Sequence, residues 1–372
     1  MTSIPNPCYI IEESLLEKNL QLMNRVKRES GITLLGALKA FSNYKTFPLV
    51  LSYLDGFTAS SLSEARLCFE EGGKKAHLCC PLYLENELNQ MIDISSHITF
   101  NTLSQYERYK TKVSGLKIGV RLNPEYSEVG TAMYNPCAYD SRLGVTLDGV
   151  PSELPEDITG LHFHMLCENN SYTFERCLKS IEEKFATYLN KVEWVNFGGG
   201  HLMTHQEYDV NHMIEVLKGF RTRFPHLEVI LEPGSAMAWR TGYLLTRIED
   251  IIEKGNQRIL MINASIANHM PDCLEMPYRP MIRDSREPME SDSIRYKIGG
   301  MTCLAGDFIG DYVFEKELKV GDDLIFEDMI HYTTVKTNTF NGVNIPSIGM
   351  LKKHGAFELF RSFGYEDFKS RL

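Results

Sequence analysis

The sequence has few of the features that mark disulfide-rich or zinc-binding proteins. It contains nine cysteines, an odd number, and none of them belongs to a C-x-x-C pair. Only Cys79 and Cys80 are adjacent, and the others are scattered along the chain. We therefore expect neither a disulfide framework nor a structural zinc module, and this use of cysteine is typical of a reducing cytoplasm.

The chain also lacks long apolar runs and an excess of basic residues. No window approaches the roughly 18 apolar residues that a membrane helix needs, and no basic start followed by a long apolar stretch opens the sequence. Acidic residues outnumber basic ones by 49 to 39, which gives a formal charge of −10. This balance argues against nucleic-acid binding, and a negative surface would instead attract a cationic ligand. We expect a cytoplasmic protein that binds neither membrane nor nucleic acid.

Eight short apolar segments rich in β-formers recur in the first two thirds of the chain, and most are separated by segments of helical character. They begin at residues 32, 56, 76, 97, 116, 158, 192 and 227. One intervening segment starts with Ser61 and Glu64 in capping-box spacing and stops on two glycines, and others carry apolar residues at helical spacing. Strands that alternate with amphipathic helices predict parallel βαβ units, and eight of them predict a (β/α)8 barrel. A doubly wound open sheet is the competing arrangement.

The pattern changes after about residue 240. Segments such as "IRYKIGG", "GDDLIFED" and "HYTTVKTNTFNGV" are strand-like, with turn signals and little helix between them. The opening segment "NPCYIIE" is also rich in β-formers and could pair with them. The sequence therefore predicts an α/β protein with a barrel over residues 11–240 and a second, all-β domain, a β-barrel or sandwich, formed by residues 1–10 and 241–372.

Unusual residues stand where several predicted strands end, which is where (β/α)8 barrels place functional side chains. Lys39 ends the first strand, in the apolar run "ITLLGALKA", and lysine is rarely buried without a partner. A lysine at a strand end often just reaches into solvent, so this residue alone indicates no chemistry. The segments "LHFHMLCE", "NFGGG" and "LEPGSA" end the sixth, seventh and eighth strands. Together these segments predict a functional site at this end of the barrel.

The sixth strand carries His162 and His164, which lie two residues apart and so share one face of the strand. With Cys167 nearby, this spacing could hold a metal, which makes a metal-dependent hydrolase one alternative. No second His/Asp cluster stands at a compatible strand end, so we expect no metal. A single inward histidine packed against a flat ligand, or a histidine hydrogen-bonded within the barrel, also fits the pattern.

The seventh and eighth strands end in three glycines and a glutamate. Gly198, Gly199 and Gly200 allow close backbone approach, so their amides could wrap a phosphate, although a tight strand-to-helix turn would need glycine equally. Their place after strand seven, where barrels often bind phosphate, favours the first interpretation. Glu232 precedes Pro233 and a further glycine. We expect it at the barrel mouth, where it could alternatively pair with a nearby lysine.

Two segments of the second domain carry further candidates. The glycine-rich loop "GGMTCLAGDFIG" places Cys303 four residues before Asp307. Most cysteines are inert packing residues, but a glycine-lined cysteine with a nearby acid would suit a proton donor. The segment "HMPDCLEMPYRP" supplies Asp272 and Glu275, which a solvated loop would also explain.

Taken together, these features resemble the fold III pyridoxal-phosphate decarboxylases, the alanine racemase-like barrel enzymes, over essentially the whole sequence. Within this family the chain is similar to the carboxynorspermidine/carboxyspermidine decarboxylases. Any one matching segment would be weak evidence, but their common order makes the combination specific. The seven segments are "GALKAFS", "LHFHMLCENN", "NFGGGH", "LEPGSAMAW", "HMPDCLEMPYRP", "GGMTCLAGDFIGDY" and "HYTTVKTNTFNG".

The resemblance implies a role for each candidate around a bound pyridoxal 5'-phosphate. Lys39 matches the lysine that forms a Schiff base with the cofactor, and His164 matches the histidine that stacks on the pyridine ring. Glu232 matches the carboxylate that faces the pyridine nitrogen, and Tyr332 resembles a tyrosine that donates to the phosphate. The phosphate-cradling loops match Gly198, Gly199, Gly200 and Gly234.

The resemblance also implies a homodimer with shared active sites. Cys303 resembles a cysteine that the partner subunit delivers, and it would return a proton to the substrate carbon. Asp272 and Glu275, joined by Asp307, would bind the cationic tail of a polyamine.

One departure from the family concerns the phosphate. Diaminopimelate and ornithine decarboxylases carry arginine after "EPG", where this chain has Ser235. Phosphate binding must be completed differently here, with Arg240 as one option. Because an arginine in this region also engages the distal carboxylate of diaminopimelate, its absence argues for a substrate whose far end is not acidic.

The implied activity is decarboxylation of carboxynorspermidine or carboxyspermidine to norspermidine or spermidine in polyamine biosynthesis, by Schiff-base exchange at Lys39. The nearest alternative is a decarboxylase of the same fold that acts on diaminopimelate, ornithine or arginine. Ser235 and the segment at 269–280 count against it. A non-enzymatic pyridoxal-phosphate-binding barrel is a second alternative, and Cys303 and the β-rich domain count against that one. The metal hydrolase is the third.

Overall fold

The computed structural model describes residues 4–372, which form two compact units. One unit comprises residues 18–237, and the other combines the residues up to Glu17 with residues 238–372. Within the described chain, no helix combines the length and the apolar character needed to cross a membrane.

The edges of the units differ from the predicted boundaries at residues 11 and 240. The segment that follows β1 stays with the β-rich unit because ion pairs hold it there. Glu13 pairs with Lys352, and the next acidic residue, Glu17, pairs with Lys353. The helix that begins at residue 13 therefore contributes its first turn to one unit and its remainder to the other.

Eight parallel strands close into a barrel in the unit formed by residues 18–237. Neighbouring strands follow the order β5-β4-β3-β2-β10-β9-β8-β6, and β5 pairs with β6 to close the ring. All eight predicted strands are present, which confirms the (β/α)8 prediction and excludes the open sheet. They are β2 (Thr33–Ala37), β3 (Gly56–Ala59), β4 (Ala76–Cys79), β5 (Ser95–Phe100), β6 (Lys117–Asn123), β8 (Ile158–His162), β9 (Trp194–Asn196) and β10 (Glu228–Leu231).

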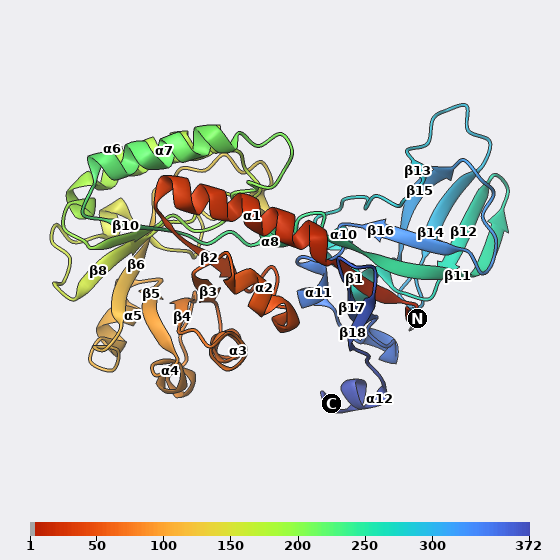
Figure 1. Ribbon diagram of the computed structural model, residues 1–372, viewed down its shortest axis with the longest axis horizontal. Coiled ribbons are helices and arrows are strands. Elements are labelled where there is room, and N and C mark those ends of the chain that lie inside the picture. The colour runs from red at the N-terminus through yellow and green to blue at the C-terminus, as the bar shows by residue number, and fades with distance from the viewer. Residues whose placement is uncertain (1–3) are drawn as a thin grey trace. The chain divides into compact units, whose positions relative to one another are not determined.

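The helices of this unit lie outside the ring of strands (Figure 1). Their ends follow local sequence signals: the Ser61 hydroxyl accepts from the Glu64 amide at the start of α3 (3.2 Å), and Gly73 follows its end with a φ of 61°. The elements are α1 (Glu13–Ser30), α2 (Phe47–Leu51), α3 (Leu62–Gly72), α4 (Glu85–Met91), α5 (Leu103–Tyr109), α6 (Ser171–Leu189), α7 (Val210–Arg223), α8 (Ser235–Ala238) and a short strand, β7 (Val145–Thr146), beside β6.

Trp194 fills the barrel interior from the first position of β9. A Cβ atom at Gly160 would lie 1.8 Å from the indole, and one at Gly119 would lie 2.4 Å from it, so both strands need glycine to admit the ring. Leu35 and Ile230 complete this buried cluster. The packed interior makes the barrel a core rather than a pore, as expected for eight strands.

The β-rich unit is built on a mixed sheet of nine strands. Its order is β13-β15-β14-β12-β11-β1-β17-β18, with β16 on β11. The opening segment forms β1, which pairs antiparallel with β11 and parallel with β17. The strands are β1 (Cys8–Glu12), β11 (Gly242–Lys254), β12 (Gln257–Ile262), β13 (Ser285–Arg286), β14 (Arg295–Gly299), β15 (Phe308–Phe314), β16 (Asp323–Glu327), β17 (Ser347–Leu351) and β18 (Phe357–Arg361), and the short helices are α9 (Ile266–His269), α10 (Asp272–Glu275), α11 (Thr333–Lys336) and α12 (Tyr365–Lys369).

Candidate active site

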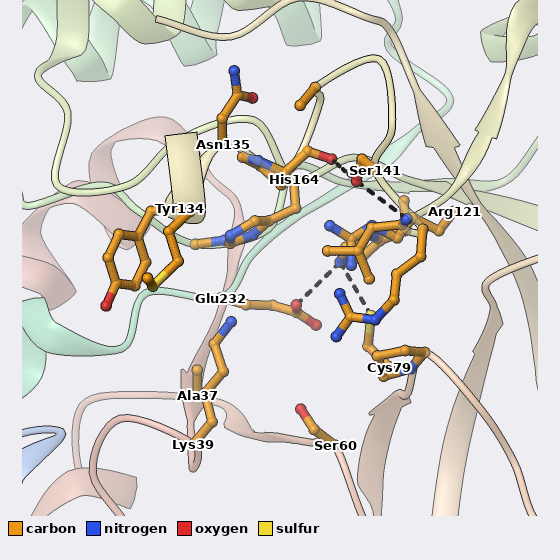
Figure 2. Close-up of a pocket in the computed structure, with 18 of the residues that line it drawn as sticks. Ala37, Lys39, Ser60, Cys79, Arg121, Tyr134, Asn135, Ser141, His164 and Glu232 are labelled. Atoms are coloured by element: carbon orange, nitrogen blue, oxygen red, sulfur yellow. Dashed lines mark hydrogen bonds and ion pairs between the residues drawn. The ribbon is translucent and has the colours of Figure 1, made fainter. Parts of the chain in front are cut away.

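A cavity of about 560 Å³ opens at the carboxyl ends of the barrel strands, and its size is typical of small-molecule sites. Side chains from different strand ends line it, among them Lys39 after β2, Cys79 on β4 and Glu232 after β10 (Figure 2). Most of residues 132–143, from the connection between β6 and β8, form another part of the wall. The cavity lies at the end of the barrel where the sequence predicts the site.

Lys39 lies in a tight turn two residues beyond the end of β2. The Ala37 amide donates to the Pro233 carbonyl (3.1 Å), and the Leu38 amide donates to the Thr58 carbonyl (3.3 Å). These bonds fix the turn between two neighbouring strands, and the buried apolar residues before it anchor β2. Figure 2 shows the amine pointing into the cavity, and the side chain is exposed there. The apolar run therefore serves to present one amine at a fixed place.

Glu232 is a buried carboxylate with a partner on each oxygen. Asn196 Nδ2 donates to Oε1 (2.7 Å), and His162 Nε2 lies 3.3 Å from Oε2. Burial alone would raise the pKa of this carboxyl, but the hydrogen bonds and charge of His162, with the bond from Asn196, lower it to about 2. The cavity therefore contains a permanently ionised carboxylate in a defined orientation.

His164 contributes a neutral ring to the same cavity. The Gly199 amide donates to Nδ1 (3.1 Å), so Nδ1 is the acceptor and the ring proton is on Nε2. Burial, together with the positive charges of Lys39 and Arg121, lowers the pKa of His164 well below its usual value. A flat, uncharged and fixed imidazole is suited to pack against an aromatic ligand.

The triple glycine corrects part of the phosphate prediction. The Gly198 amide donates to Asn196 Oδ1 (2.8 Å), and the Gly199 amide donates to His164, so neither amide points to a ligand. A Cβ atom at Gly198 would lie 2.5 Å from His164 Nδ1, which explains why glycine is needed there. Only Gly200, with a φ of 85°, keeps its amide as a candidate for the phosphate.

Gly234 belongs to the close packing beneath the site. A Cβ atom at this position would lie 2.7 Å from the Cβ of Ala40, so the chain after Glu232 passes directly against the turn that carries Lys39. The small residue therefore allows the two charged groups of the cavity to be placed by adjacent backbone segments.

Tyr332 and Arg240 belong to the β-rich unit. Tyr332 has a φ of 47°, a conformation that is uncommon for a bulky residue and is concentrated at functional sites. The Arg240 guanidinium stacks over the Trp239 ring, 5.7 Å from its centroid, and its amide donates to Asp328. Arg240 does not line the cavity described here, so its contribution to phosphate binding stays a prediction.

Asp307 orders the loop that carries Cys303. Its Oδ1 accepts from the Ser265 hydroxyl and the Ala267 amide (both 3.0 Å), and its Oδ2 accepts from the amide and hydroxyl of Thr302 (3.0 and 2.7 Å). The residue is 5% exposed. Four hydrogen bonds leave no oxygen facing a ligand, which favours a structural role over the predicted contact with substrate. The same loop leaves Cys303 exposed.

Asp272 and Glu275 share one cation. Both stand on α10, and their carboxylates contact Lys336 Nζ at 2.5 and 2.6 Å. Although burial lowers the pKa of Lys336, the two carboxylates raise it above its usual value. The pair is therefore spaced to hold a single ammonium group between its side chains.

The sequence patterns did not single out three residues near the Glu232 carboxylate, and they left the role of His162 open. Asn196, Cys79 and Arg121 lie at or near strand ends, and Cys79 and Arg121 line the cavity. His162 contacts Glu232 rather than sharing a metal with His164, and no group of three or more potential metal ligands occurs among residues 4–372. The rule that located Lys39 and Glu232 applies equally to Asn196, the last residue of β9.

Comparison with known proteins identifies the family. The model of the pyridoxal-dependent decarboxylases, described as "Pyridoxal-dependent decarboxylase, C-terminal sheet domain", matches residues 8–330. The chain belongs to the pyridoxal-dependent decarboxylases. It is an enzyme of the carboxy-lyase class, with the barrel and sheet domain that the family combines.

Individual members of the pyridoxal-dependent decarboxylases match over nearly the whole chain. A carboxyaminopropylagmatine decarboxylase from Synechocystis sp. is 50% identical, covering 100% of this chain and 96% of the relative. A carboxynorspermidine/carboxyspermidine decarboxylase from Campylobacter jejuni is 38% identical, covering 99% and 98%. The crystal structure of carboxynorspermidine decarboxylase from Campylobacter jejuni, complexed with norspermidine, has a TM-score of 0.93 and 37% identity over 99% of this chain and 100% of that one.

Proposed function

We propose that this chain uses pyridoxal 5'-phosphate to remove the carboxylate of carboxynorspermidine or carboxyspermidine, which yields norspermidine or spermidine. The observation that carries the proposal is that one cavity brings together the amine of Lys39, the neutral ring of His164 and the ionised carboxylate of Glu232. Full-length similarity to decarboxylases of carboxyaminopropyl amines supports the substrate class.

The residues present fit the cofactor. An amine, a flat neutral imidazole and a buried carboxylate match an aldehyde, an aromatic face and a ring nitrogen in chemical type. When bound, pyridoxal phosphate supplies an aldehyde and an electron-withdrawing ring that stabilises the charge left as carbon dioxide departs. The cavity volume of about 560 Å³ is sufficient for a ligand of this size.

In this proposal, each residue of the candidate site has a defined task. Lys39 would hold the cofactor through its amine, which is the nucleophile that an aldehyde requires. Glu232 holds a proton at the ring nitrogen, which its full ionisation allows. His164 covers the ring face and excludes water from it. The phosphate is assigned to Gly200, Gly234 and Tyr332.

Recognition of the substrate tail is assigned to Asp272 and Glu275. Their existing pairing with Lys336 supports this assignment, because it demonstrates a spacing suited to one cationic group. A polyamine ammonium would either share this acidic pair or take the place of the lysine.

Neutralising the acidic pair should weaken substrate binding selectively. In the double variant Asp272→Asn/Glu275→Gln, we expect the KM for a carboxylated polyamine to rise at least about tenfold, because two charge-assisted contacts are lost. The affinity for pyridoxal phosphate, measured by equilibrium dialysis, should stay unchanged. Glu249→Gln, which removes an exposed charge from β11 of the same unit, serves as the control. An unchanged KM in the double variant would remove the acidic pair from the substrate site.

A second candidate substrate is favoured by the identity of 50% to a carboxyaminopropylagmatine decarboxylase. Agmatine ends in a guanidinium, and a planar guanidinium can bind two carboxylates with parallel hydrogen bonds. Comparing kcat/KM for carboxyspermidine and carboxyaminopropylagmatine separates the two candidates. A preference of tenfold or more for the guanidinium substrate, a difference of about 1.4 kcal/mol, would make it the natural one.

We further propose that the enzyme works as a homodimer in which Cys303 acts in the partner's active site as proton donor. The exposure of the thiol supports this role, and so do the exposed apolar side chains of Met301 and Leu304 on the same loop and of Phe308 at the start of β15. Apolar side chains gathered around an exposed thiol suit an interface better than open solvent.

Mixing two defective variants tests the shared site. Cys303→Ala should slow turnover about tenfold or more, and Lys39→Ala should be inactive. If each site combines residues from both subunits, reassociated mixtures contain dimers with one intact site, and activity rises towards about a quarter of the wild-type value. Turnover and product that are unchanged in Cys303→Ala, or mixtures with no more activity than their components, would contradict the assignment.

The cysteines support placing this reaction in the cytoplasm. All nine are free thiols, and six of them are buried. Secreted proteins that use cysteine for stability pair their thiols instead.

A further inference from the structure

A buried imidazole connects the carboxylate of Glu232 to a thiol of the cavity wall. His162 is 1% exposed, and its Nε2 atom lies 3.3 Å from Glu232 Oε2 and 3.6 Å from Cys79 Sγ. Dashed lines in Figure 2 mark both contacts. The three residues come from the ends of β8, β10 and β4, which are not neighbours in the ring, so the contacts span the barrel interior.

Two acceptors of this cluster share a single N–H donor. A contact between Nε2 and an ionised carboxylate requires the N–H on Nε2, and then this atom has no lone pair to accept from a thiol. Cys79 Sγ and Glu232 Oε2 therefore compete for one N–H of His162. The other ring nitrogen, Nδ1, has no hydrogen-bond partner among the described residues. The strength of the bond to Glu232 thus depends on the state of the thiol.

Charges around the imidazole strengthen the link. Burial would lower the pKa of His162, but Cys79 and Glu232 raise it to about 9. Burial would raise the pKa of Cys79, but His162 lowers it. Other titratable groups in this part of the barrel are Arg121, which pairs with His162 in the β6–β8 register, His164, and His77, whose charge acts on Glu232. None of them carries negative charge. A charged imidazole at this place holds the carboxylate ionised.

We propose that His162 is a positioning residue for the decarboxylation, which fixes the direction and the charge of the Glu232 carboxylate, and that Cys79 modulates this link by competing for the same N–H. The inference rests on the proposed function, since Glu232 is the residue that holds the proton at the ring nitrogen. Asn196 anchors the other carboxylate oxygen but cannot titrate. Of the two residues that contact the Glu232 carboxylate, His162 is therefore the one through which pH acts on it.

Three variants of the holoenzyme test the link. His162→Leu removes the donor, His162→Gln keeps an N–H donor without a titratable group, and Cys79→Ala removes the competitor. The matched control is Cys80→Ala, which removes the adjacent thiol, whose residue does not line the cavity. The readouts are the dissociation constant of pyridoxal phosphate, by equilibrium dialysis, and kcat and KM for the carboxylated polyamine.

We expect His162→Leu to weaken cofactor binding and to lower kcat, each by about tenfold for every pKa unit by which Glu232 rises into the working range. The KM should change by less than about twofold, because the substrate tail is bound elsewhere. His162→Gln should recover most of both losses at neutral pH. Cys80→Ala should behave as the wild type.

The pH profile supplies a readout that a purely structural role would not move. The wild type should lose kcat in a one-proton step near the His162 pKa of about 9. This step should be absent from His162→Gln. In Cys79→Ala it should move to lower pH, because the loss of a negative neighbour favours the neutral imidazole.

The inference is overturned if His162→Leu binds the cofactor and turns over substrate like the wild type. It is also overturned if His162→Gln loses as much as His162→Leu, or if the alkaline step persists in His162→Gln. If His162→Leu fails to fold, the glutamine and Cys79→Ala variants still decide the question. A wild-type protein that binds no pyridoxal phosphate would instead overturn the proposed function.

Discussion

Replacing Lys39 with alanine is expected to reduce kcat at least about a thousandfold, to the limit of detection. The turn after β2 holds this amine at the mouth of the cavity, and no other lysine lines the cavity walls described here. Lys39→Arg should fail equally, because a guanidinium keeps the positive charge but is not a free amine nucleophile. Carbon dioxide release measures the loss of turnover, and the visible absorbance of the bound cofactor measures the loss of its link to the lysine amine.

A matched control separates chemistry from charge. Lys45 follows six residues later, and its ammonium lies over the Tyr44 ring, 5.0 Å from the centroid. Lys45→Ala removes the same charge from the same connection and should retain wild-type turnover. A Lys39→Ala enzyme with more than a few per cent of wild-type kcat, at unchanged thermal stability, would refute the assignment of Lys39.

Replacing Glu232 with glutamine is expected to lower kcat by about 10²- to 10³-fold, the usual effect of removing a preorganised electrostatic partner. Glutamine is nearly isosteric and can still accept from Asn196, but it cannot hold a proton at the ring nitrogen of the cofactor. Because the pKa of Glu232 is lowered to about 2, the wild-type carboxylate is ionised at every pH of normal assays. The deficit of the variant should therefore be constant across the neutral range, as a kcat–pH profile would reveal.

Glu228 provides the control for Glu232. It stands at the opposite end of the same strand, β10, where it accepts from the Thr33 hydroxyl (2.9 Å) and lies 3.5 Å from Lys117. Glu228→Gln removes a carboxylate from the barrel without touching the cavity, and kcat should stay within about twofold of the wild type. A Glu232→Gln enzyme that matches Glu228→Gln in kcat would exclude a role of the carboxylate at the ring.

Much of this architecture was predictable because periodicity is local. The alternation of short apolar segments with amphipathic helices placed all eight barrel strands, and the rule that functional residues follow strand ends located Lys39, His164 and Glu232. The capping signals at Ser61 and Gly73 likewise act within a few residues. None of these inferences required knowing which strands face each other across the barrel.

The sequence did not predict which side chains contact one another across the barrel interior. Cys79 and Glu232 are far apart in the chain, and only closure of the ring brings both to the same atom of His162. The glycines were also only partly predictable from sequence. The need for small residues was evident, but the sequence did not reveal that the amides of Gly198 and Gly199 donate hydrogen bonds to the neighbouring side chains of Asn196 and His164.

Loop carboxylates were similarly ambiguous. An acidic residue in a glycine-rich loop can face a ligand or organise the loop, and composition does not distinguish the two. The four hydrogen bonds to Asp307 favour a role in organising its loop. Asp272 and Glu275 remain candidates for binding a ligand, because Asp272 already pairs with the ammonium of Lys336.

The central claim is tested most directly by carbon dioxide release from carboxyspermidine, carboxynorspermidine, diaminopimelate and ornithine, each with and without added pyridoxal phosphate. The account predicts cofactor-dependent release from the carboxylated polyamines, with kcat/KM at least about a hundredfold above the values for diaminopimelate and ornithine. Preferential release from diaminopimelate or ornithine, or release from no substrate by protein that is saturated with the cofactor, would contradict it.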